Sequence, residues 1–256
     1  MGILEIKDIT LRFGGVVALD NVSYEVQEGE IFSLIGPNGA GKTSMLNCIS
    51  GLYRPASGSI SFKGENITHL KPHKRASLGI ARAFQNIELF PHLSVLDNLM
   101  LGRHVRMKTG VLSGGIYWGK AQKEEVEHRR KVEYVIDFLE IEHIRELPVG
   151  TLSYGLQKRV EVGRALALEP EILLLDEPMA GMNTEEKEDM ARYIIDIHEE
   201  MKTTIILIEH DMGVVMDLSD HIAVLDFGKL IGYGTPGEIQ NNPKVIEAYL
   251  GEEHAG

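Results

Sequence analysis

Short apolar runs bounded by glycine or polar turns recur along the chain, and each run predicts a β-strand. The first two runs surround a Gly14–Gly15 turn, and Lys63–Asn66 has the composition of another turn. Ile172–Leu175 is apolar at every position, which is typical of a parallel strand covered on both faces. The predicted strands are Leu4–Phe13, Val22–Val26, Ile31–Ile35, Ile60–Phe62, Ile172–Leu175, Thr204–Ile208 and Ile222–Leu225.

Helical patterns lie between these strands. A helix is predicted over Lys42–Ser50, where Gly51 ends it. Two more are predicted over Leu93–Leu101 and Lys120–Leu139, with the glycine-rich segment Ser113–Gly115 between them. Strands then return in the last third of the chain, and neither a repeat nor a flexible linker divides the sequence. We therefore predict one α/β domain that contains a helical insertion.

The composition narrows the class of protein further. Of the 256 residues 43% are hydrophobic, and the formal net charge is -12. No run approaches the roughly 18 to 20 apolar residues of a membrane span, and the start of the chain lacks the pattern of a signal peptide. The single cysteine, Cys48, fits a buried thiol in a reducing compartment. We expect a cytoplasmic protein, and the negative charge argues against a nucleic-acid surface.

Residues 36–43 read GPNGAGKT and fit the pattern G-x-x-x-x-G-K-[ST] at every fixed position. The glycines let successive N–H groups face one phosphate at the positive end of the next helix. Lys42 can then reach the β- and γ-phosphates, and the Thr43 hydroxyl can coordinate Mg²⁺. A chance glycine-rich turn is the alternative. The predicted strand before the motif and the predicted helix after it favour a nucleotide-binding loop.

A second motif follows the apolar run Ile172–Leu175, which continues into Asp176, Glu177 and Pro178. The carboxyl ends of parallel strands face the ligand crevice of an α/β sheet. Asp176 is expected to hold Mg²⁺ through its waters, and Glu177 to orient or deprotonate the attacking water. Two acidic residues at the end of a strand are common, so this interpretation depends on the phosphate loop.

With these two motifs, the chain resembles the ATP-binding subunits of the ABC transporter family. The resemblance extends over nearly its whole length. Leu152–Gln157, with the sequence LSYGLQ, looks like the family signature LSGGQ. From the residues alone, Ser153 is a good helix N-cap, and a plain capped helix is the alternative interpretation. The resemblance implies that Ser153, Tyr154 and Gly155 meet the γ-phosphate held by another subunit.

The resemblance also implies roles for three further residues. Gln85 matches a glutamine that touches Mg²⁺ and senses the membrane partner, and His210 matches the switch histidine. Phe13 matches the aromatic residue that stacks on adenine. Taken alone, His210 would be a structural histidine and Phe13 an ordinary core phenylalanine.

These matches imply a complete set of site residues. Glu177 and His210 would be catalytic, and Thr43, Gln85 and Asp176 would hold Mg²⁺. The expected contacts to ATP come from Phe13, Gly36, Asn38, Gly39, Ala40, Gly41, Lys42, Thr43 and Ser44.

Two positions depart from the family pattern. Leu156 stands at the final glutamine of the signature, with Gln157 one position later, which puts that side-chain contact in doubt. Asn183 stands where the family usually has the aspartate of the D-loop, so a carboxylate role there is in doubt as well.

A narrower resemblance is to the ATPases of high-affinity branched-chain amino-acid uptake systems. It is carried by Phe13–Gly15, the LSYG signature, Ala180–Asn183, Ile208–Met212, Ala248–Gly251 and the insertion Gly102–Lys120, which contains Tyr117 and Trp118. Those two aromatic residues can equally cap the helical part. ATPases for urea or short-chain amide uptake, or for lipopolysaccharide export, share much of the pattern. The motifs would also suit a soluble ABC ATPase outside transport or a non-catalytic nucleotide-binding module.

The resemblance implies an architecture and a set of partners. We expect a P-loop NTPase core of mostly parallel sheet (1–85 and 166–256), with an N-terminal antiparallel β subdomain and an inserted α-helical subdomain (86–165). The expected partners are a second ABC ATPase subunit, integral membrane permease subunits and, indirectly, a periplasmic or surface solute-binding protein. The chain would then lie on the inner face of the membrane. Docking is expected near Gln85–Leu93, where Leu89, Phe90 and Pro91 form an apolar cluster, although core packing would also explain them.

Overall fold

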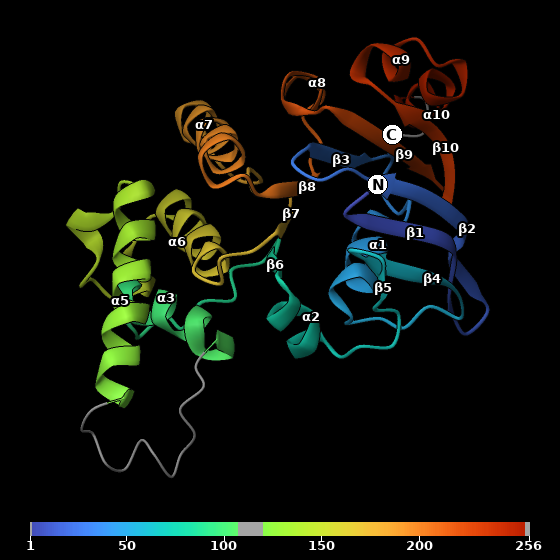
Figure 1. Cartoon of the computed structure of the whole chain (residues 1–256). Coiled ribbons are helices and arrows are strands. Elements are labelled where there is room, and N and C mark those ends of the chain that lie inside the picture. Colours follow the sequence, from blue (N-terminus) through green and yellow to red (C-terminus); the bar gives the residue numbers. More distant parts are fainter. Residues whose placement is uncertain (1, 107–119, 254–256) are drawn as a thin grey trace.

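Two β-sheets form the framework of the chain, for which the computed structural model describes residues 2–106 and 120–253 (Figure 1). The larger sheet has six strands in the order β10-β9-β3-β8-β7-β6. All neighbours in it are parallel except β10, which pairs antiparallel with β9. These strands are β3 (Ile31–Ile35), β6 (Ile80–Ala83), β7 (Ile172–Asp176), β8 (Thr204–Ile208), β9 (His221–Asp226) and β10 (Lys229–Gly234).

The smaller sheet is antiparallel and comes from the N-terminal part of the chain. Its order is β2-β1-β4-β5, formed by β1 (Leu4–Phe13), β2 (Val16–Val26), β4 (Ser57–Phe62) and β5 (Glu65–Asn66). Helix α1 (Lys42–Ser50) lies between the two sheets, and its Met45, Leu46 and Cys48 are fully buried against both. The mostly parallel core and the antiparallel N-terminal subdomain are confirmed, and so is the buried free thiol of Cys48.

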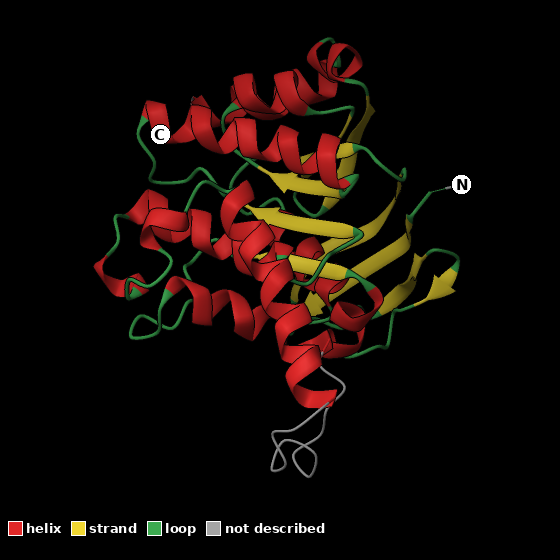
Figure 2. Cartoon of the chain, turned by 60° about the vertical axis from the view of Figure 1, so that its left-hand side comes forward, coloured by secondary structure: helices red, strands yellow, loops and turns green. Residues whose placement is uncertain are grey.

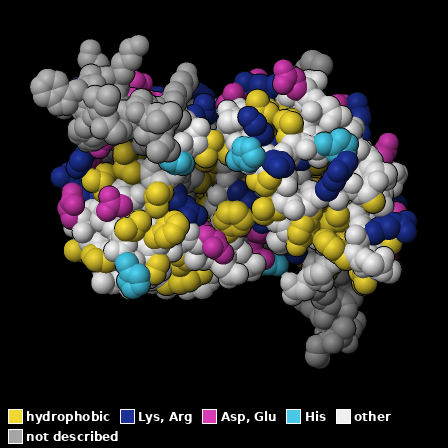
Figure 3. Space-filling view, turned by 90° about the horizontal axis from the view of Figure 1, so that it is seen from below, with side chains coloured by type: hydrophobic (Ala, Val, Ile, Leu, Met, Phe, Trp, Pro, Cys, Tyr) yellow, Lys and Arg dark blue, Asp and Glu magenta, His cyan; other side chains and the backbone are white. Residues whose placement is uncertain are grey.

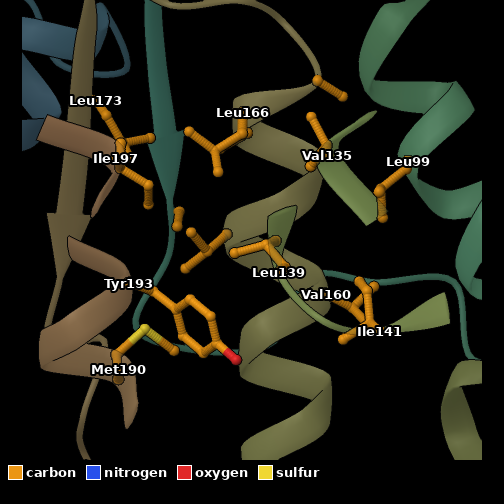
Figure 4. Packing of buried hydrophobic residues seen from close by; sticks show 14 of the residues in the cluster. Leu99, Val135, Leu139, Ile141, Val160, Leu166, Leu173, Met190, Tyr193 and Ile197 are labelled. Atoms are coloured by element: carbon orange, nitrogen blue, oxygen red, sulfur yellow. The ribbon is translucent and has the colours of Figure 1, made fainter. Parts of the chain in front are cut away.

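The helices between β6 and β7 pack around α6 (Tyr154–Leu166). Leu99 from α3 (Val95–Arg103) and Val135 from α5 (Lys120–Phe138) contact one side of it. Figure 4 shows that the same cluster continues to Tyr193 of α7 (Thr184–Met201) and to Leu173 of β7. The helical part therefore shares one continuous hydrophobic core with the large sheet. In Figure 2 the strands gather at one side of the molecule and most helices at the other.

Several predicted boundaries were wrong. Strand β2 begins at Val16, because it pairs with β1 directly after the Gly14–Gly15 turn, and β4 begins at Ser57. Glu65–Asn66 belongs to a short strand, so the predicted Lys63–Asn66 turn is too long. Helix α3 begins two residues later than predicted, since Ser94 caps it by accepting a hydrogen bond from the Asp97 N–H at 3.1 Å.

The sequence pattern missed several short elements and one long one. The 3₁₀ turns are His104–Arg106, Glu142–Ile144 and Val149–Thr151. The missed helices and strands are α2 (Pro72–Leu78), β6, α7, α8 (Met212–Leu218), β10, α9 (Pro236–Gln240) and α10 (Pro243–Glu253). The glycine-rich segment Ser113–Gly115 and the aromatic pair Tyr117–Trp118 lie outside the described residues.

The surface is chemically mixed. On the face seen in Figure 3, apolar, acidic and basic side chains are interspersed over both halves of the molecule. Within residues 2–106 and 120–253, no helix has the length and apolar character needed to cross a bilayer.

Candidate active site

The phosphate loop joins the end of β3 to the start of α1 and is closely packed. Gly36 has φ 144°, and a Cβ atom there would lie 2.0 Å from the carbonyl oxygen of Leu225. Only glycine fits this combination of close approach and positive φ. The loop is further tightened where the Ala40 N–H donates to the Pro37 carbonyl at 3.1 Å. The N-cap of α1, Gly41, provides no side-chain hydrogen bond to the first N–H groups of the helix, as at an anion-binding helix N-terminus.

Lys42 is buried, and its ammonium group lies inside the loop. Its Nζ donates to the carbonyl oxygens of Gly36 at 2.7 Å and Pro37 at 3.0 Å. A buried ammonium group requires such acceptors. The loop's own carbonyls therefore hold this cation at the position that a bound phosphate would face.

A cavity of about 410 Å³ opens over the loop and is large enough for a small-molecule ligand. It brings together most of the residues predicted to touch the nucleotide. It also includes Val16, Val17, Ala18 and Phe227, which were not predicted. The lining residues are Val16, Val17, Ala18, Asn38, Gly39, Ala40, Gly41, Lys42, Thr43, Ser44, Glu177 and Phe227.

Phe13 lies beside this site without lining the cavity. Its ring packs edge-on against Tyr53, with ring centroids 5.1 Å apart. Its side chain is 47% exposed, so the ordinary core interpretation of Phe13 is wrong. Phe227, 86% exposed in the β9–β10 turn, is the aromatic side chain among the residues that line the cavity.

Three predicted residues meet beyond the ends of neighbouring parallel strands. Ala83 pairs with Leu175, and Asp176 pairs with Ile208, so the carboxyl ends of β6, β7 and β8 are in register. Gln85, Glu177 and His210 follow these ends. The Glu177 carboxylate accepts from Gln85 Nε2 at 2.6 Å and lies 2.6 Å from His210 Nε2. Glu177 also has φ 51°, a conformation that non-glycine residues mostly adopt where the surroundings enforce it.

Asp176 is buried at the end of β7 and has one oxygen bound by a cation. Its Oδ2 accepts from the Arg82 guanidinium at 2.6 Å, and both side chains are nearly inaccessible. Its Oδ1 is buried and has no hydrogen-bond partner among the described residues. Arg82 also donates to Asn47 Oδ1 at 2.6 Å, which links β6 to α1. Buried carboxylate oxygens are normally satisfied, so Asp176 Oδ1 is a candidate ligand atom.

Glu209 supports this arrangement and was not predicted. Its carboxylate accepts from the backbone N–H groups of Met179 at 2.8 Å and His210 at 3.2 Å. It is buried, and burial raises the pKa of its carboxyl group. Glu209 thereby ties the loop after β7 to the loop after β8. Its position directly after a buried strand was the sequence signal that could have found it.

The signature residues, Leu152–Gln157, do not line the cavity over the phosphate loop. Ser153 caps α6 by accepting from the Leu156 N–H at 3.4 Å, as predicted, and Tyr154 is exposed beside Gly181. At Gly155, a Cβ atom would lie 2.3 Å from Glu186 Oε1, so α6 approaches α7 closely here.

The two positions that depart from the family pattern, Leu156 and Asn183, have local roles, and so does Gln157. Leu156 is partly buried and packs against the hydrophobic core. Gln157 turns back and donates to the Leu152 carbonyl at 2.9 Å. Asn183 caps α7 in a reciprocal capping box: its Oδ1 accepts from the Glu186 N–H at 3.0 Å, and Glu186 accepts from the Asn183 N–H at 3.1 Å.

Comparisons with known proteins agree with this geometry. The family model described as "ABC transporter" matches residues 19–180, and one described as "Branched-chain amino acid ATP-binding cassette transporter" matches residues 229–255. The high-affinity branched-chain amino acid transport ATP-binding protein BraF of Pseudomonas aeruginosa is 42% identical over 253 residues, which cover 98% of each chain.

Two solved structures are similar as well. The ADP conformation of an ATP-binding cassette of an ABC transporter is 32% identical and superposes with a TM-score of 0.84, covering 98% of this chain and 99% of that one. A dimeric ATP-binding cassette in a post-hydrolysis state, bound to ADP and phosphate, is 25% identical with a TM-score of 0.77. That match covers 91% of this chain and 98% of the other.

A phosphate loop between the parallel strand β3 and a helix, with carboxylates at the end of β7 two positions along the same sheet, defines a P-loop nucleotide-binding ATPase. The family match covers well over half of the chain. The chain belongs to the ABC transporter family and is one of its ATP-binding, ATP-hydrolysing subunits.

Proposed function

We propose that this subunit hydrolyses ATP at Glu177 and that the hydrolysis drives uptake of branched-chain amino acids through partner membrane subunits. The observation that carries the proposal is the Glu177 carboxylate, which lines the phosphate-loop cavity and is held between Gln85 and His210. The solute is inferred from the relatives, because no residue of this site would contact it. The C-terminal match over residues 229–255 and the named relative support that inference.

Binding of the triphosphate would rearrange Lys42. Its Nζ would exchange the carbonyl oxygens of Gly36 and Pro37 for β- and γ-phosphate oxygens. The N–H groups of residues 39–44 and the positive end of α1 would hold the remaining phosphate charge. Phe13 would stack on the adenine from the end of β1, where its ring is partly exposed.

The site also suits Mg²⁺, which prefers oxygen ligands. Asp176 Oδ1 is a buried oxygen without a protein partner, and the Thr43 side chain is exposed at the start of α1. Gln85 can add its amide oxygen, since its Nε2 is the atom that binds Glu177. The ion would neutralise charge on the β- and γ-phosphates.

Glu177 would act as the general base. Each of its two carboxylate oxygens has one hydrogen-bond partner, Gln85 or His210, and keeps a lone pair that can accept a proton from water. With Glu177 ionised, His210 Nε2 must carry a proton and donate it to the hydrogen bond. His210 would then hold Glu177 in position while the γ-phosphate is attacked.

A second ATPase subunit would complete the site. Ser153 and Tyr154 are exposed on α6 and belong to a different part of the surface from the cavity over the phosphate loop. Two subunits facing each other would place the signature of one against the nucleotide of the other. The dimeric relative bound to ADP and phosphate supports such an assembly.

The membrane partners would dock near residues 85–93. Leu89 is partly buried and packs against the core, as the core-packing alternative requires. Phe90 is 55% exposed and Pro91 is also exposed, so these two side chains would contact the permease. This contact would hold the subunit on the cytoplasmic face of the membrane, with a solute-binding protein acting from the other side.

Reconstitution tests the transport function. The subunit, its sister ATPase and the permeases would be placed in lipid vesicles, and ATP hydrolysis measured with the solute-binding protein. We expect leucine-loaded binding protein to stimulate hydrolysis, urea to have no effect, and Lys42→Ala to abolish the response. Stimulation by urea with none by leucine would contradict the proposed solute. Stimulation by DNA or ribosomes, without dependence on permeases, would contradict the role in transport.

A further inference from the structure

Three charged side chains lie along one face of the signature helix α6, at Lys158, Glu161 and Arg164. Their spacing of three residues places them on neighbouring turns. Lys158 and Glu161 are each 1% exposed, and the side chain of Arg164 is mostly buried. Charged residues are seldom buried so completely unless they have partners.

Besides the ion pairs of Glu161 with Lys158 and Arg164, all three side chains bind backbone groups of residues 84–88, which we call the 84–88 segment. Lys158 Nζ donates to the carbonyl oxygens of Phe84, at 3.1 Å, and Gln85. Glu161 Oε1 accepts from the Glu88 N–H at 3.2 Å. Arg164 donates to the Glu88 carbonyl oxygen. A segment without regular secondary structure is thereby bound to α6 at both of its ends.

Burial opposes the ionised forms in this cluster, although the opposite charges of Lys158 and Glu161 attract each other. Lys158 Nζ lies 3.8 Å from Glu161 Oε2. Burial lowers the pKa of Lys158 and raises that of Glu161. A buried pair of this kind seldom adds stability over apolar residues of the same size, but it can fix one arrangement of the chain.

Gln85 connects this cluster to the catalytic carboxylate. Its carbonyl oxygen is bound by Lys158 of α6, whereas its side chain donates to Glu177 Oε2 at 2.6 Å. The backbone of Gln85 is thus attached to the signature helix, and its side chain reaches the end of β7.

We propose that Lys158, Glu161 and Arg164 are positioning residues that fix the 84–88 segment to the signature helix, so that Gln85 transmits the position of α6 directly to Glu177. A shift of α6 relative to β7 would then act on the Gln85–Glu177 hydrogen bond instead of being absorbed by a flexible segment. This inference rests on the proposed roles of Gln85 and Glu177.

The test separates positioning from stability by replacing the whole buried pair. The double variant Lys158→Met/Glu161→Leu exchanges both charges for apolar groups, a change that is often neutral for stability. Arg103→Met is the matched control: Arg103 is equally buried and donates to the Ala167 carbonyl at 2.7 Å, just beyond the other end of α6. Thermal unfolding of the full chain reports the stability of each variant.

Amide hydrogen exchange measures the attachment directly and needs no nucleotide. The Glu88 amide should exchange about tenfold or more faster in the double variant, because it loses a hydrogen bond to a charged acceptor. Arg103→Met should leave that rate unchanged. Unchanged exchange at Glu88 in the double variant would overturn the proposal.

A double-mutant cycle with Gln85→Ala tests whether the attachment of the 84–88 segment affects the rate of ATP hydrolysis. In the parent chain the double variant should lower kcat by on the order of 10- to 100-fold, with KM for ATP unchanged, since a catalytic contact is misplaced. In a Gln85→Ala background the same double variant should cost less than about twofold, because the residue it positions is gone. An equal loss in both backgrounds, or none in the parent chain, would overturn the proposal. If Gln85→Ala alone left kcat unchanged, the proposed role of Gln85 would be wrong, and with it this inference.

Discussion

Glu177 combines an unusual backbone conformation with two side-chain partners. Its positive φ turns the chain directly after β7, while its N–H donates to the Ile208 carbonyl at 2.9 Å. Gln85 and His210 then bind both carboxylate oxygens. The strain and the hydrogen bonds orient the carboxylate together, and this is the kind of preorganisation that a general base requires.

Lys42 gives the first prediction. Lys42→Ala removes the ammonium group that would bind the β- and γ-phosphates, so ATP binding should weaken by about 3 kcal/mol or more, over 100-fold. Calorimetric titration with ATP measures the loss. Lys63→Ala, at an exposed position outside the lining of the cavity, is the control and should bind normally. Unchanged affinity in Lys42→Ala would contradict the assignment of the loop.

The two exposed aromatic residues near the site give the second prediction. Phe13→Ala should weaken ATP binding by about 1 to 3 kcal/mol, the usual range for aromatic–base stacking. Thermal stability should change little, because the side chain is 47% exposed. Phe227→Ala is the matched variant, since Phe227 lines the cavity. A loss of affinity in Phe227→Ala with none in Phe13→Ala would transfer the stacking role to Phe227.

The phosphate-loop residues and Glu177 could be found from the sequence, because each belongs to a short motif whose chemistry is local. Arg82 and Phe227 could not, since their roles depend on contacts between distant segments. Arg82 reaches Asp176 only because β6 pairs with β7. No spacing of residues along the chain encodes that pairing.

Among the elements, α7 was missed although the sequence carries its start signal. Asn183 and Glu186 have the spacing of a capping box, and the helix runs from Thr184 to Met201. Strand β6 was missed for a different reason. It has four residues and contains Arg82, whose charge interrupts the apolar pattern but is balanced by Asp176 in the folded chain.

Asn183 gives a prediction about the stability of helix α7. Asn183→Ala removes the cap of α7 and should lower the free energy of unfolding by about 1 kcal/mol, a fall in Tm of about 2 to 4 °C for a chain of this size. Asn183→Asp, the family's usual residue, keeps the acceptor oxygen and should unfold within about a degree of the parent. Thermal unfolding followed by circular dichroism measures both. Equal losses in the two variants would show that the carboxylate cannot replace the amide as cap.

At the scale of the whole molecule, the residues predicted for the site lie in two parts of the surface. The phosphate loop and Glu177 share one cavity, while Ser153 and Tyr154 are exposed at the start of α6. The helical part shares a continuous core with the large sheet, so bending the chain to bring these surfaces together would disrupt packed side chains. A second subunit can supply the signature residues while the packed core of each chain stays intact.

The oligomeric state of a hydrolysis-deficient variant shows whether two subunits form the site together. Glu177→Gln keeps the size of the side chain but removes the proton acceptor, a change that typically slows hydrolysis by about 10² to 10⁴-fold. ATP should bind and persist, so the closed dimer should accumulate. Ser153→Arg in the same chain should block it, because the added bulk and charge would lie at the seam.

Light scattering of the Glu177→Gln chain, alone and with its sister subunit, gives the measurement. We expect a monomer of 28.5 kDa without nucleotide and a dimer with ATP and Mg²⁺, which Ser153→Arg returns to a monomer. A Glu177→Gln chain that binds ATP yet stays monomeric at saturating ATP, with the sister subunit also present, would contradict the two-subunit site.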